Sequence, residues 1–116
     1  NNIQSNKIKR IFANISVKFG NCLNFIRQTN KSYDYIYFDF MFNVFKNALP
    51  SKRDQFLRKI TNNNVEINRS IIKETIQRMN CKIIIKEHVK SHDYDDLNII
   101  NTYKEKVVKY NLIGSK

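Results

Sequence analysis

An apolar residue recurs every three or four positions through the first part of this chain. The members of the series are Ile8, Phe12, Ile15, Phe19, Cys22 and Ile26. At about 100° per residue, this spacing places every member on one narrow face of a helix. The pattern therefore predicts a continuous amphipathic helix over residues 5–29. Because Cys22 belongs to the apolar face, we expect its thiol to be buried.

The same segment is strongly basic. Six cations precede the first acidic residue, Asp34, and they are Lys7, Lys9, Arg10, Lys18, Arg27 and Lys31. The whole chain has 21 Lys and Arg against 10 Asp and Glu, which gives a formal net charge of +11. A charge of this size favours polyanionic partners such as nucleic acid, anionic lipid headgroups or acidic glycans.

Glycine and proline, the usual turn residues, are scarce. The chain has 2 Gly and 1 Pro in 116 residues, of which 41% are hydrophobic. This length predicts a single domain over residues 1–116. The scarcity of turn residues argues against sandwiches and barrels and favours long helices. No run is long and apolar enough for a transmembrane segment, and the polar start does not resemble a signal peptide.

Aromatic residues dominate residues 33–49. On a helical wheel the apolar side chains leave only a narrow polar sector, which is typical of a helix in the centre of a fold. A strand is the alternative, because Tyr33, Tyr35 and Tyr37 alternate with other residues and aromatics favour sheets. The length of the segment favours the helix, which Pro50 would end. Phe40 and Phe45 are the predicted core positions, where alanine should cost about 3–5 kcal/mol if the ring is fully buried.

The remaining elements are also expected to be helical. Ser51 and Asp54 resemble a capping box before a helix over 52–61, and a further helix is predicted over 65–80. Residues 81–89 read as a helical continuation, with a short strand over 82–86 as the alternative. Asp93, Asp95 and Asp96 would begin a last helix. Its core residues would be Leu97, Ile100, Tyr103, Val107 and Val108. The predicted fold is therefore all-α, a compact bundle of about five helices around the aromatic helix over 33–49.

No pattern identifies a reaction. His88 and His92 stand four residues apart and could face one metal on a helix, but Lys90 lies between them and the nearby aspartates already serve as cap residues. Nothing in the sequence pairs Cys22 or Cys81 with a general base, and Gly-rich phosphate loops are absent. We expect no catalytic residues, no metal and no cofactor. A Cys22–Cys81 disulfide is a minor alternative to two free thiols.

Basic surface with interleaved aromatic residues is the strongest functional signal. The predicted nucleic-acid-binding residues are Lys7, Lys9, Arg10, Lys52, Arg53, Arg58 and Lys59. A further group, Lys82, Lys86 and Lys90, could extend the same face. Exposed tyrosines could stack on unpaired bases. These features predict a non-catalytic module that binds RNA or DNA, or a subunit of a ribonucleoprotein assembly with protein neighbours. They leave the compartment undetermined and favour an intracellular one.

Three fragments are similar to type II interferon. They are Lys7 to Phe12 in the first predicted helix, Phe40 to Asn47 in the central one, and Asp96-Leu97-Asn98 at the start of the last. The resemblance implies a secreted, short helical cytokine-like protein that binds a cell-surface receptor. For this alternative we expect an oxidised Cys22–Cys81 pair or a sugar on Asn14, Asn30 or Asn68.

Overall fold

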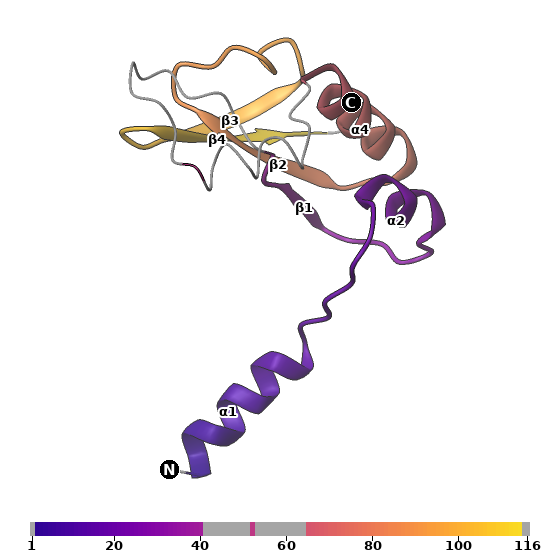
Figure 1. Cartoon of the computed structure of the whole chain (residues 1–116), viewed down its shortest axis with the longest axis vertical. Helices are drawn as coiled ribbons and strands as arrows, with labels where there is room; N and C mark the ends of the chain where they lie inside the picture. Colours follow the sequence, from indigo (N-terminus) through magenta and orange to yellow (C-terminus); the bar gives the residue numbers. More distant parts are fainter. Residues whose placement is uncertain (1, 41–51, 53–64, 115–116) are drawn as a thin grey trace.

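The computed structural model describes residues 2–40, 52 and 65–114, which form an α/β structure (Figure 1). The helices of the described part are α1 (Asn2–Ala13), α2 (Cys22–Gln28) and α4 (Val65–Arg78). Its strands are β1 (Tyr35–Phe38), β2 (Lys82–His88), β3 (Ile99–Lys104) and β4 (Val108–Ile113). The predicted all-α bundle around a central aromatic helix is therefore wrong.

The four strands make one mixed sheet in the order β1-β2-β4-β3. β1 and β2 are parallel, and the chain between them includes α4. β4 pairs antiparallel with both β2 and β3. The short connection between β3 and β4 makes this pair a hairpin. β2 and β4 thus occupy the centre of the sheet.

The core lies between one face of the sheet and the helices α2 and α4. Ile83 and Ile85 on β2 point to this face and are fully buried, whereas Ile84 between them points to the opposite face and is half-buried. Ile72 on α4 and Ile113 on β4 are also fully buried in the same core. Burial thus alternates with a period of two along three consecutive isoleucines, which is typical of a strand with one buried face and one more exposed face.

The helix predicted over residues 5–29 is interrupted. α1 ends at Ala13 and α2 begins only at Cys22. Gly20 has a φ of +149°, which residues with a Cβ rarely adopt. Asn21 then caps α2, because its side chain accepts hydrogen bonds from the backbone N–H groups of Leu23 and Asn24. The predicted burial of Cys22 is wrong as well, since this residue is exposed.

The segment predicted as a central helix over 33–49 contains the strand β1. Ile36 and Phe38 pair with Ile83 and Ile85 of β2 on the core face, and this pairing outweighs the helical pattern of the segment. Phe40 is half-buried and its ring stacks on Phe38 with centroids 5.0 Å apart. Phe45, residues 41–49 and all but residue 52 of the helix predicted over 52–61 lie outside the described residues.

In the C-terminal half, the helix predicted over 65–80 is confirmed as α4. The strand alternative for 82–86 is also confirmed, as β2, and the helical continuation is wrong. The prediction of a last helix after Asp93 is wrong, because β3 and β4 form a hairpin in this part of the chain. Asp96 does not cap a helix; its carboxylate pairs with Arg69 on α4 at 2.5 Å. Three predicted core residues, Ile100, Tyr103 and Val107, are exposed.

Candidate nucleic-acid interface

The basic N-terminal segment stands apart from the rest of the chain. Figure 1 shows α1 projecting away from the sheet at the end of an extended connection. All residues from 3 to 22 are exposed, including the apolar stripe of α1 formed by Ile8, Ile11 and Phe12. A helix of this length is marginally stable alone in water. We call residues 2–21 the N-terminal arm.

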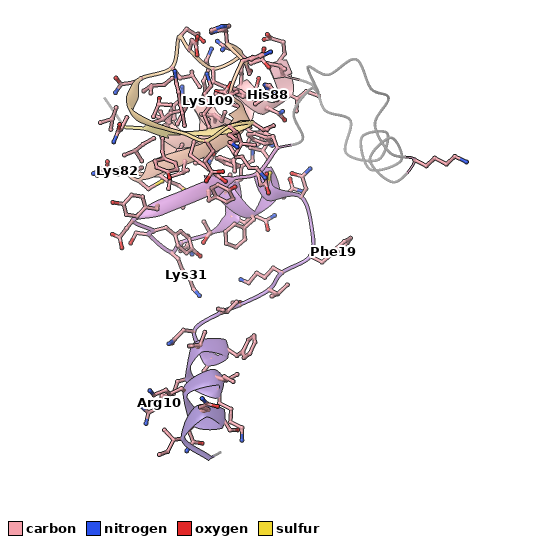
Figure 2. All side chains as sticks on the ribbon, turned by 90° about the vertical axis from the view of Figure 1, so that its left-hand side faces the viewer. Arg10, Phe19, Lys31, Lys82, His88 and Lys109 are labelled. Carbon is pink, nitrogen blue, oxygen red and sulfur yellow. The ribbon has the colours of Figure 1, made fainter. Side chains whose placement is uncertain are left out.

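The structure describes four of the seven predicted cations. Lys7, Lys9 and Arg10 lie on the N-terminal arm and are exposed, and Figure 2 shows Arg10 pointing into solvent. Lys52 is exposed too. Arg53, Arg58 and Lys59 lie outside the described residues, so the arm is the part of the predicted site that can be described.

The second candidate surface is the sheet face opposite the core, which we call the open face. Tyr35 and Tyr37 of β1 and Tyr103 of β3 point to this face and are 56%, 50% and 66% exposed. Tyr110 of β4 is half-buried beside Tyr103, with ring centroids 6.4 Å apart. Strand alternation thus gathers tyrosines from three strands on one surface.

Lysines accompany these rings. Lys82 is the β2 partner of Tyr35 and carries its Nζ 6.0 Å from the centre of the tyrosine ring. Lys86 is the β2 partner of Tyr110 and also makes an ion pair with Asp39 at 3.6 Å. The open face is therefore aromatic and basic, with one acidic side chain among the residues named.

The Tyr37 phenol on this face remains protonated near neutral pH. Burial raises the pKa of Tyr37, the Asp39 carboxylate raises it further, and Lys86 opposes the rise. The ring therefore carries no negative charge that would repel a phosphate.

Aromatic surface continues around the edge of the sheet toward α2. A hollow of about 330 Å³ is lined by Tyr35 and Tyr37 together with Tyr33 and with Cys22 and Phe25 of α2. Tyr33 and Phe25 lie 6.4 Å apart. The rings of the open face are thus part of a larger aromatic area.

The histidines do not form the metal pair that their spacing allowed. His88 is buried at the end of β2, where its Nδ1 accepts a hydrogen bond from the Lys90 backbone N–H. His92 is exposed and its Nδ1 lies 2.6 Å from Asp95 Oδ2. Within residues 2–40, 52 and 65–114, no group of three His, Cys, Asp or Glu side chains could hold a metal. Cys22 and Cys81 are both free thiols.

The structure adds a second candidate surface to the cations predicted from the sequence. The sequence directed attention to the cations of the arm, whereas the tyrosines of the open face come from segments that we predicted to be helical. Tyr35 and Tyr37 alternate with other residues, and this signal supported only the strand alternative for that segment. The same spacing of Val108, Tyr110 and Leu112 is a signal that we did not use.

Comparisons with known proteins found no family model, no curated protein and no solved structure that matches this chain. The all-helical fold implied by the interferon resemblance is not the fold of the described residues. None of the helices in the described ranges is long and apolar enough to cross a membrane.

Proposed function

We propose that this chain is a non-catalytic module that binds nucleic acid, either free or within a ribonucleoprotein assembly. The observation that carries the proposal is the distribution of charge. Residues 1–33 contain six Lys and Arg and no Asp or Glu, whereas residues 65–114 contain nine Lys and Arg and seven Asp and Glu. Four of the six cations before β1, Lys7, Lys9, Arg10 and Lys18, lie on the exposed N-terminal arm, which therefore carries positive charge and no acidic residue.

Such an arm suits a polyanion. Lys7, Lys9 and Arg10 are exposed within one turn of helix and can each contact a different phosphate. Basic segments that are marginally stable alone often become ordered when they bind nucleic acid. Phosphate contacts of this kind are insensitive to sequence, so the arm would supply affinity rather than specificity.

The proposal is tested by fluorescence anisotropy with labelled single-stranded RNA and duplex DNA over a range of salt concentrations. Binding should weaken steeply with salt, because counterions are released from the nucleic acid. The triple variant K7Q/K9Q/R10Q should bind more weakly and lower the slope of log affinity against log salt by about 2 for a single strand. Glutamine is chosen because it keeps the helix propensity of α1.

A matched control is the triple variant K73Q/K104Q/K106Q, which removes the same charge from exposed positions on α4, on β3 and beside β3. A net-charge effect would weaken binding equally in both variants, whereas a site on the arm requires a larger loss in the arm variant. If neither single-stranded RNA nor duplex DNA binds at low salt, the proposed function is wrong.

A further inference from the structure

We infer that the open face of the sheet is a stacking platform for unpaired bases, so that the ligand is a single strand rather than a duplex. The inference rests on the proposed function and adds the class of nucleic acid. It assigns the site to Tyr35, Tyr37, Tyr103 and Tyr110 with Lys82.

The tyrosines are arranged to receive more than one base. Tyr35 and Tyr37 lie on the edge strand β1, and Tyr103 lies on the opposite edge strand β3. With strands about 4.8 Å apart, the two edges of a four-stranded sheet are separated by roughly 14 Å. Tyr110 lies between them and supports the Tyr103 ring at 6.4 Å. A strand of nucleic acid crossing the sheet could therefore stack bases at both edges.

The exposure of these rings is unusual for structural residues. A tyrosine that serves the core buries its ring, yet Tyr35, Tyr37 and Tyr103 are each at least half exposed. The apolar residues between them, Ile84 and Leu112, are half-buried and form the floor of the face. Exposed apolar and aromatic surface of this kind marks an interaction site.

The charge beside the tyrosine rings favours a nucleic acid over a neutral apolar partner. Lys82 extends over the Tyr35 ring and carries a cation that a phosphate beside a stacked base can approach. A neutral apolar partner would need to bury this cation, whereas a nucleic acid supplies both flat rings and negative charge. In a duplex the faces of the bases are already stacked on one another, so only unpaired bases can use the tyrosines.

The first test needs no variant of the protein. Binding of a labelled 12-nucleotide single strand is compared with that of an abasic strand of equal length and with a duplex. We expect the base-bearing strand to bind at least about 5-fold more tightly than the abasic strand, since each base stacked on an aromatic ring contributes about 5- to 150-fold in affinity. Equal affinity for all three probes would overturn the platform and leave the proposed function standing.

The second test removes the rings. The variants Y35T and Y103T remove the ring and introduce threonine, which favours strands as tyrosine does. Y35F and Y103F are matched controls that keep the ring and remove only the hydroxyl. Threonine should lower single-strand affinity about 5- to 150-fold at a stacked position and leave duplex affinity unchanged, while phenylalanine should preserve both. If the threonine and phenylalanine variants bind alike, the rings do not stack on bases.

An independent signal comes from the protein's own fluorescence. The chain contains 6 Tyr and no Trp, so its emission reports the tyrosines directly. Single strands should quench this emission and duplex DNA should not. Tight binding of single strands without quenching would contradict the inference, and absence of binding by every probe would instead refute the proposed function.

Discussion

Glu87 gives the sharpest test of the structure because it is a carboxylate in the core. It lies on the buried face of β2, is 1% exposed, and accepts a hydrogen bond through Oε2 from the Asn111 side-chain amide. Its other oxygen, Oε1, is buried without a hydrogen-bond donor in the described part of the chain. Burial raises the pKa of Glu87, while the Ser91 hydroxyl and Lys109 oppose the rise. Nearby Asp93 and Asp95 raise it further.

The raised pKa of Glu87 determines whether the free energy of unfolding rises or falls with pH. The folded state holds the proton of Glu87 at pH values where the unfolded chain, with its ordinary value of 4.5, has released it. The free energy of unfolding therefore falls as pH rises from about 4.5 through the pKa of the folded state. The variant E87Q keeps an oxygen for Asn111 and cannot ionise, so it should remove this decline and become more stable than the parent as pH rises.

The hydrogen-bond network sets the magnitude of a second change. The Asn111 amide donates to Glu87, and its Oδ1 accepts a hydrogen bond of 2.9 Å from the Thr102 hydroxyl. Asn111→Ala would remove the hydrogen-bond donor to Glu87 and the hydrogen-bond acceptor of Thr102. A buried polar group left without its partner costs about 1–3 kcal/mol. The cost at Glu87 should be larger when the group is ionised, so the destabilisation caused by N111A should increase as pH rises through the pKa of folded Glu87.

The assay is urea unfolding followed by circular dichroism at pH values between 4 and 8. The parent, E87Q, N111A and the exposed control E105Q are compared at each pH. The difference in stability between E87Q and the parent should grow with pH, whereas E105Q should follow the parent. A difference that stays constant over this range would mean that Glu87 is solvated in the folded protein, and the assignment of its side chain to the core face would be refuted.

Three further predictions concern the fold, each measured by urea or thermal unfolding. Ile85→Ala should lower the free energy of unfolding by about 2–5 kcal/mol, because Ile85 is fully buried. Ile100→Ala should lower it far less, because Ile100 is exposed. Equal losses of stability in the two variants would contradict the register of the sheet. The Arg69 side chain lowers the pKa of Asp96 to about 2. The stability that this pair contributes is therefore present above pH 3.8 and is lost as pH falls toward 2. The variant D96N should not show this loss of stability in acid. Asn21→Ala should cost about 1 kcal/mol through loss of the α2 cap, and Asn21→Ser should retain most of it; similar losses for both would exclude the capping role.

The sequence predicted α4 correctly because its helical pattern extends over 14 residues. Ile72 and Ile76 contact the core, while Lys73 and Gln77 beside them are exposed. A pattern this long leaves little room for a strand of the same residues. The short strand alternative at 82–86 could also be stated, because three adjacent isoleucines suit a buried strand.

Local pattern offered β1 only as an alternative to a helix and did not lead us to β3 and β4, because the stability of these strands comes from distant partners. β1 is four residues long and is held by parallel pairing with β2, more than 40 residues away in the chain. The spacing of Leu97, Ile100 and Tyr103 fits a helix, yet the hairpin pairs Tyr103 with Tyr110 and exposes Ile100. Tertiary pairing thus overrides a local helical signal, as strand preferences often depend on context.

The candidate site shows the same division between local and distant information. Charge is a property of composition, so the basic arm can be recognised from the order of its residues alone. The open face, in contrast, exists only because β1, β4 and β3 bring Tyr37, Tyr110 and Tyr103 to one side of the sheet. If both surfaces contact one nucleic acid, the arm would attract any strand by its charge, and the platform would retain those with unpaired bases. Affinity and discrimination would then reside on separate elements, and this separation is why substitutions on the arm and on the sheet can test them independently.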